Sequence, residues 1–173
     1  MESISVFDML SIGIGPSSSH TLGPWRAANL WIKKLQQREL FTGVASVKVN
    51  LYGSLSLTGK GHATDIAVVM GLMGTDPVTY DIENIQPEIE ALKKNNTLKL
   101  NNEKPIDFNF KEQIIFNRKF LDFHPNGITF EATLRNGKKT RDTYYSIGGG
   151  FVVQKERARA KRQKEKFPKQ PNY

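Results

Sequence analysis

The sequence has no cysteine among its 173 residues and only three histidines. The missing thiols exclude disulfide bonds, thiolate-ligated metal ions and cysteine nucleophiles within this sequence. It also has no apolar run that approaches the ~20 residues of a membrane-spanning helix. The first ten residues include acidic side chains and no basic ones, unlike a secretory signal peptide. We therefore expect a cytoplasmic protein that makes no membrane contact.

Hydrophobic residues make up only 38% of the sequence, and they are scarcest at its end. Residues 155–173 hold eight Lys or Arg and two Glu, so they contribute +6 of the formal net charge of +8. Such a tail is typical of a solvated linker or polar helix, or of an arm that binds nucleic acid. Because only Phe167 and Tyr173 could stack on bases, we favour the linker and expect no nucleic-acid partner. The expected organisation is one domain over 4–154 and a basic linker or tail over 155–173.

The pattern of apolar residues predicts helices and strands in mixed order. Apolar residues three and four apart predict an amphipathic helix over 24–40, and alternation predicts a strand over 44–51. An almost wholly apolar segment predicts a buried helix over 64–74, and a surface helix is expected over 85–94. The remaining strands are expected late in the sequence, over 98–100, 106–110, 113–116, 127–135 and 140–154. This order favours an α+β fold, in which helices pack on a mixed or antiparallel sheet.

The most distinctive segment covers residues 13–24 and leads into the first predicted helix. Five consecutive residues in it carry hydroxyl or imidazole groups: Ser17, Ser18, Ser19, His20 and Thr21. Its glycines allow the backbone to approach a ligand closely, and a helix start offers free N–H groups to an anion. A helix cap would need only one of these hydroxyls, and the lysine of a phosphate-binding loop is absent. We interpret the segment as a site for a small ligand with a carboxylate or phosphate group, and not for a nucleotide.

A second segment, residues 58–65, places His62 between glycine-rich sequence and the predicted buried helix. His20 has the same local setting, and two such loops that face one cleft would supply an acid and a base. A histidine in a surface loop explains His62 equally well, and Thr64 or the residue before it can act simply as the helix cap. Composition alone leaves these alternatives open.

Two further segments carry weaker signals. The sequence His124-Pro125-Asn126-Gly127 is typical of a turn, although the Asn126 amide could also donate a hydrogen bond to a substrate. The three successive glycines at 148–150 indicate a kink or bulge at a strand end. Neither segment by itself predicts a site.

Together the four segments resemble the β domain of iron–sulfur-dependent L-serine dehydratases, also called L-serine ammonia-lyases. The family pattern is similar to residues 15–24, 59–65, 124–127 and 145–151, in that order. The resemblance extends from about Val6 to Val153, which is nearly all of the expected domain.

This resemblance implies deamination of L-serine to pyruvate and ammonia. It implies a [4Fe–4S] cluster ligated by cysteines of a separate catalytic α domain, either downstream or in a partner chain, with no metal ligand in this chain. By the matching segments, His20 and His62 would transfer protons and Asn126 would orient the substrate. The residues that would bind L-serine beside the cluster are Ser17, Ser18, Ser19 and Thr21. We also expect a homodimer.

Because it has no cysteine, this chain alone is expected to bind no cluster and to show no dehydratase activity. The family's β domain also resembles a regulatory domain of some serine-pathway dehydrogenases. The alternative function is therefore a non-catalytic domain that binds an amino acid or an anion. The sequence does not assign acid and base to the two histidines, and it does not distinguish serine from threonine as substrate.

Overall fold

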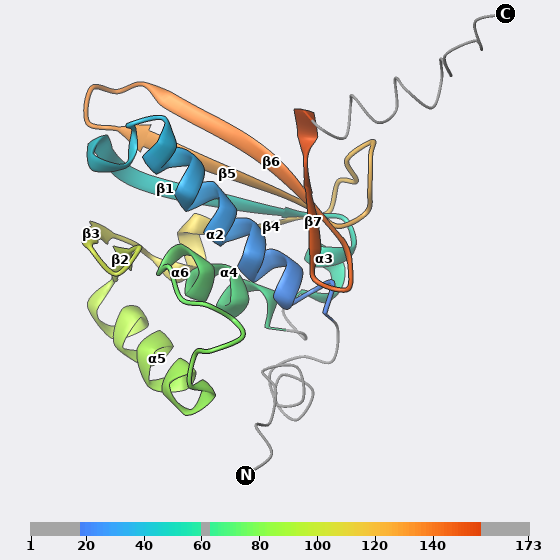
Figure 1. Cartoon of the computed structure of the whole chain (residues 1–173), viewed down its shortest axis with the longest axis horizontal. Coiled ribbons are helices and arrows are strands. Elements are labelled where there is room, and N and C mark those ends of the chain that lie inside the picture. Colours follow the sequence, from blue (N-terminus) through green and yellow to red (C-terminus); the bar gives the residue numbers. More distant parts are fainter. Residues whose placement is uncertain (1–17, 60–62, 157–173) are drawn as a thin grey trace, which may run out of the picture.

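The structure, a computed structural model, describes residues 18–59 and 63–156. Its centre is a five-stranded mixed sheet with the order β4-β1-β5-β6-β7, and a separate two-stranded sheet pairs β2 with β3 (Figure 1). The strands are Val44–Tyr52 (β1), Thr97–Leu100 (β2), Lys104–Asp107 (β3), Ile114–Asn117 (β4), Gly127–Leu134 (β5), Lys139–Gly148 (β6) and Phe151–Gln154 (β7). Strand β1 pairs in parallel with β4, whereas the other neighbours in the large sheet are antiparallel. The predicted α+β class with a mixed sheet is confirmed.

The helices of the described residues lie between or before these strands. They are Leu22–Gln37 (α2), Ser54–Thr58 (α3), Thr64–Leu72 (α4), Ile85–Asn95 (α5) and Phe110–Gln113 (α6), with short 3-10 turns at Phe41–Gly43 and Ile82–Asn84. Figure 1 shows α2 crossing one face of the large sheet. No helix among residues 18–59 and 63–156 is long and apolar enough to cross a membrane.

Helix α2 packs on the sheet through the apolar face that its sequence predicts. Trp25, Trp31 and Leu35 are fully buried, and the Trp31 ring stacks on Phe130 of β5 with centroids 5.1 Å apart. Each such side chain contributes roughly 1.5–3 kcal/mol when it leaves water. A Cβ atom on Gly71 of α4 would lie 2.3 Å from the Trp25 carbonyl oxygen, so α2 and α4 touch backbone to backbone. This close packing fixes the start of α2 against the helix that follows the second glycine-rich segment.

Ion pairs hold the C-terminal end of α2 against strand β6. Lys34 Nζ lies 2.5 Å from Asp142 Oδ1 on β6, and Trp31 Nε1 donates to Asp142 Oδ2 at 3.2 Å. Arg38 is a more distant partner of the same carboxylate, at 3.6 Å. The Asp142 side chain is only 5% exposed, so the cations compensate a charge that is almost out of solvent.

Two of the predicted strands differ from the structure. The segment 140–154 is two antiparallel strands, β6 and β7, because Gly148, Gly149 and Gly150 all have positive φ angles and reverse the chain. The segment 106–110 ends as a strand at Asp107, since the Asn109 side chain accepts hydrogen bonds from two backbone N–H groups and starts α6. Both strand predictions were wrong where a turn interrupts apolar sequence.

No periodic pattern of apolar residues in the sequence predicts helix α3. It begins directly after Gly53, whose φ of +56° turns the chain sharply at the end of β1. A Cβ at Gly53 would lie 2.4 Å from the Pro125 carbonyl oxygen, so only glycine permits this approach. The turn places Ser54 beside the segment that contains Asn126.

Candidate active site

The hydroxyl-rich segment ends in a turn that leads into α2. The Gly23 N–H donates to the Ser18 carbonyl at 3.0 Å, and the Trp25 N–H donates to the Thr21 carbonyl at 3.0 Å. Thr21 occupies the N-cap position, but its hydroxyl makes no capping hydrogen bond to the helix. Helix capping therefore does not explain the hydroxyl groups of this segment.

The His20 imidazole lies between two serine hydroxyls. Its Nδ1 is 3.0 Å from Ser19 Oγ, and its Nε2 is 3.2 Å from Ser54 Oγ at the start of α3. His20 is 9% exposed, whereas both serines are only partly buried. The ring is thus held at both nitrogens by neutral groups, each of which can donate or accept a hydrogen bond.

Asn126 lies on a neighbouring turn and is 8% exposed. Its Nδ2 donates to the Ser146 carbonyl at 3.1 Å, and this acceptor fixes which way the amide points. The opposite atom, Oδ1, is buried and has no hydrogen-bond partner. A buried acceptor without a partner costs about 1–3 kcal/mol, so a water molecule or a ligand group is expected to donate there.

His124 supports the same turn. Its Nδ1 accepts a hydrogen bond from the Asn126 backbone N–H at 3.1 Å, which requires that this nitrogen carry no proton. Burial lowers the pKa of His124 below its ordinary value. Both the contact and the pKa favour neutral imidazole, so the role of His124 is to shape the turn that carries Asn126.

Ser146 joins the first segment to the Asn126 turn. Its hydroxyl donates to the Ser19 carbonyl at 2.6 Å, and its N–H donates to the Asn126 carbonyl at 3.0 Å. A Cβ on Gly23 would lie 1.8 Å from the Ser146 hydroxyl oxygen, so Gly23 must be glycine for this contact to exist. Ser146 is fully buried and connects three of the four distinctive segments through its own and neighbouring bonds.

The structure brings together most of the predicted residues that it describes. His20, Ser19 and Asn126 belong to one hydrogen-bonded cluster, while Thr21 is buried at the start of α2. Ser18 contributes its carbonyl to the turn. The remaining predicted residues, Ser17 and His62, lie outside the described residues.

The described residues on either side of 60–62 are hydrogen-bonded to each other. The Thr64 N–H donates to the Gly59 carbonyl at 2.9 Å, and Gly59 directly follows α3. Ala63 is the N-cap of α4, and the Thr64 hydroxyl is buried without a hydrogen-bond partner instead of capping the helix.

Two residues of the cluster, Ser54 and Ser146, were not predicted as site residues. Ser146 lies within the fourth segment, next to the glycine turn, so its position could have suggested it. Ser54 lies 34 residues from His20 in an irregular stretch, and nothing in the local sequence signals that contact.

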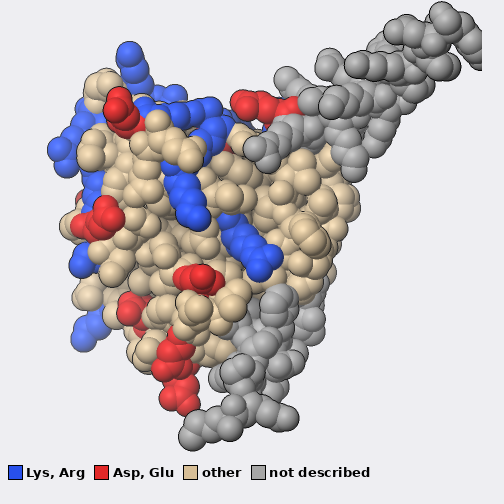
Figure 2. All heavy atoms as spheres, viewed as in Figure 1, with Lys and Arg blue, Asp and Glu red and all other residues tan. Residues whose placement is uncertain are grey.

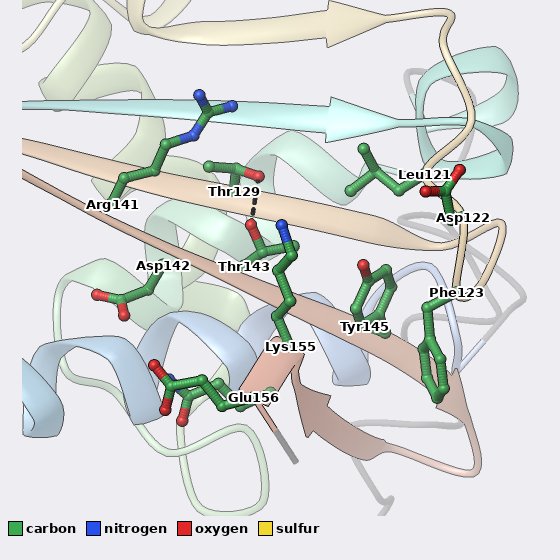
Figure 3. Close-up of a pocket in the computed structure, with 11 residues that line it drawn as sticks. Leu121, Asp122, Phe123, Thr129, Arg141, Asp142, Thr143, Tyr145, Lys155 and Glu156 are labelled. Carbon is green, nitrogen blue, oxygen red and sulfur yellow. Dashed lines mark hydrogen bonds between the residues drawn. The ribbon is translucent and has the colours of Figure 1, made fainter. Parts of the chain in front are cut away.

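A separate pocket of about 550 Å³ is lined by residues of β5 and β6, of the segment before β5 and of the segment that follows β7 (Figure 3). Thr129 and Thr143 share a hydrogen bond of 3.0 Å within it, and Arg141, Lys155 and Asp122 are among its other lining residues. None of the predicted site residues lines this pocket. Within residues 18–59 and 63–156, no group of three or more His, Asp or Glu side chains could hold a metal ion.

Comparison with known proteins identifies the family to which this chain belongs. A family model described as the serine dehydratase beta chain matches residues 5–157. The chain is 49% identical to the L-serine dehydratase of Haemophilus influenzae over 152 residues, which cover 87% of this chain and 33% of that protein. It is 46% identical to the L-serine dehydratase of Streptomyces coelicolor over 161 residues, or 92% of this chain and 35% of that protein.

An Escherichia coli relative, L-serine dehydratase 1, is 44% identical over 154 residues, which cover 88% of this chain and 34% of that protein. The chain therefore spans about a third of the length of these curated relatives. The match includes the segments that form the hydrogen-bonded cluster around His20. The chain belongs to the serine dehydratase β chain family.

Proposed function

We propose that this chain supplies one half of an active site that deaminates L-serine to pyruvate and ammonia. The observation that carries the proposal is the buried His20 imidazole, held between two hydroxyls in a hydrogen-bonded cluster that also contains Asn126, whose Oδ1 has no partner. An imidazole titrates near neutral pH and can take or give the proton that an elimination must move. An amide oxygen is an acceptor suited to the ammonium group of an amino acid.

The other half of the site would come from a catalytic α domain that corresponds to the remaining two thirds of the relatives. A [4Fe–4S] cluster held by cysteines of that domain would supply a Lewis acid for the departing hydroxyl. The residues of this chain fit such an arrangement as neighbours of the cluster and not as its ligands. The sequence has no thiol, and both nitrogens of His20 already contact serines.

Exposed apolar side chains near the hydrogen-bonded cluster of His20 form a rim that supports contact with an α domain. Leu57 of α3 is 58% exposed, and Phe120, whose ring lies against Gly53, is 59% exposed. Ile147 and Phe151 of the β6–β7 hairpin are 43% and 70% exposed. Figure 2 shows few charged side chains over the end of the molecule that carries β7. We propose that the α domain covers this rim, because exposed apolar patches mark protein contacts.

The roles of the residues in this proposal are those that the family resemblance implies. His20 moves a proton, Asn126 orients the substrate, and Ser18, Ser19 and Thr21 bind it. His62 and Ser17 keep their expected roles as second proton-transfer residue and substrate ligand. A homodimer and a cytoplasmic location complete the proposal and rest on the family resemblance.

A chimera tests the proposed function. The third of the Haemophilus influenzae enzyme that matches this chain is replaced by this chain, and pyruvate formation is measured after anaerobic iron–sulfur reconstitution. We expect activity from the chimera and none from this chain alone. His20→Asn in the chimera should lower kcat by about 10²–10⁴-fold, the usual contribution of general acid–base catalysis. Unchanged kcat in this variant would remove His20 from the mechanism.

Calorimetry with L-serine distinguishes the proposed function from the alternative of a non-catalytic regulatory domain. If this chain is half of an active site, L-serine should bind the isolated chain much more weakly than it binds the chimera. Tight binding to the isolated chain, together with an inactive chimera, would instead indicate a domain that senses an amino acid.

A further inference from the structure

Ser54 contacts the His20 ring at the nitrogen opposite the one that Ser19 contacts. The imidazole is 9% exposed, and its Nε2 points at the Ser54 hydroxyl at 3.2 Å. Ser54 is only partly buried. A ligand that approaches this side of the ring therefore meets the hydroxyl before it meets the nitrogen.

Two backbone hydrogen bonds, one from Ser54 and one from Gly53, fix the position of Ser54. Its N–H donates to the Pro125 carbonyl at 3.0 Å, and the preceding Gly53 N–H donates to the Lys119 carbonyl at 2.8 Å. Pro125 precedes Asn126 directly, so one hydroxyl contacts His20 while its backbone holds the turn of Asn126. Ser19, the other hydroxyl on the ring, is next to His20 in sequence, and its carbonyl is fixed by Ser146.

A serine hydroxyl can accept one hydrogen bond while it donates another. If His20 is neutral with its proton on Nδ1, that N–H donates to Ser19 Oγ and the Ser54 hydroxyl donates to Nε2. If the proton is on Nε2, Ser54 Oγ accepts it and the Ser19 hydroxyl donates to Nδ1. The cationic ring donates to both oxygens. The ring can thus change its protonation state without losing either partner.

We propose that Ser54 relays protons between His20 and the bound amino acid, an inference that rests on the proposed function. When His20 acts as base, the Ser54 O–H bond breaks toward Nε2 while its oxygen binds the proton that leaves the substrate. The electron pair of the broken substrate bond stays on the substrate. Ser54 ends with one proton, as it began, and the single net change is a proton on the imidazole. When His20 acts as acid, the same steps run in reverse.

The first test measures the contact in this chain itself. Nitrogen-15 NMR of the imidazole ring reports the tautomer of His20 and its titration, and it needs no cluster. Ser54→Ala should shift the Nε2 resonance, whereas Ser54→Thr keeps the hydroxyl and should restore it. Ser56→Ala, two residues along α3, is the matched control and should leave the ring unchanged. An unchanged resonance in Ser54→Ala would overturn the contact and with it the proposal.

The second test measures the relay in the chimera. Ser54→Ala should lower kcat about 10- to 100-fold and alter both its pH profile and its solvent deuterium isotope effect, with Ser54→Thr recovering most of the rate. If Ser54→Ala shifts the NMR signal but leaves kcat, the pH profile and the isotope effect unchanged, Ser54 is only structural and the relay is overturned. Failure of the proposed function is recognised separately, since His20→Asn would then also leave the rate unchanged.

Discussion

The two ends of α2 both hold polar side chains against the sheet, but in different chemical forms. At the C-terminal end, the Asp142 carboxylate meets Lys34 and Arg38, so this buried charge has partners of opposite sign. At the N-terminal end, His20 meets neutral hydroxyls, and nearby Asn126 Oδ1 has no partner. Figure 2 shows the same division on the surface, where Lys and Arg gather away from the end that carries β7.

This contrast separates a contact that holds the fold from a cluster that we propose binds a ligand. A compensated ion pair gains little from a further charged group. Hydroxyls that can reverse their hydrogen bonds, and an acceptor without a donor, can still bind a ligand group. The two ends should therefore respond differently to substitution, one in stability and the other in activity.

The largest effect on stability is expected at the charged end. Asp142→Ala would leave Lys34 partly buried without its partner and should lower the free energy of unfolding by about 3–5 kcal/mol. Urea unfolding followed by circular dichroism measures this. Glu131→Ala, which removes the partner of the exposed Lys139 at 3.4 Å, is the control and should cost less than about 1 kcal/mol. Similar losses in the two variants would contradict the structural role of Asp142.

An intermediate effect is expected where the helix and the site meet. Gly23→Ala would place a Cβ 1.8 Å from Ser146 Oγ, and the overlap should cost about 1–3 kcal/mol. In the chimera it should also reduce activity, because Ser146 positions the Ser19–His20 segment. Adding Ser146→Gly removes the overlapping atoms and should recover stability but not activity. Recovery of both would mean that the Ser146 hydroxyl does not position the site.

The smallest effect concerns pH. Burial lowers the pKa of His124 below its ordinary value near 6.5, so the unfolded chain takes up a proton before the folded chain does. The free energy of unfolding should then fall as pH drops from above 6.5 toward the folded pKa, and the contribution of His124 should be constant below it. His124→Asn should remove this slope in urea unfolding between pH 5 and 8. An equal slope in both proteins would contradict the prediction.

Local sequence pattern was enough to predict the elements whose stability comes from one apolar face. The helices α2, α4 and α5 and the strands β1 and β5 lie close to their predicted ranges, because periodic burial is encoded within a few residues. The pattern failed at α3 and between β6 and β7. There, glycines with positive φ angles decide the path of the chain: the glycines at 148–150 indicated a kink, but not that it reverses the chain into a new strand.

Local sequence likewise predicted some residues of the candidate site and none of the long-range contacts between them. Glycine and hydroxyl residues before a helix marked the segment of His20, and the turn sequence marked Asn126. The contacts of His20 with Ser54 and of Ser19 with Ser146 join residues 34 and 127 positions apart. Such contacts depend on how strands β1 and β6 pair with β5, which no spacing within one segment can reveal.

The bond between Ser146 and Ser19 also has a consequence for biosynthesis. A chain leaving the ribosome exposes the His20 loop long before β6 has been made, so the loop has no buried hydroxyl to hold it. Closing so distant a contact is entropically costly until β1, β5 and β6 are paired. The His20 loop should therefore become ordered among the last parts of the molecule, and a nascent chain that stops short of Ser146 should fold α2 without forming the hydrogen-bonded cluster.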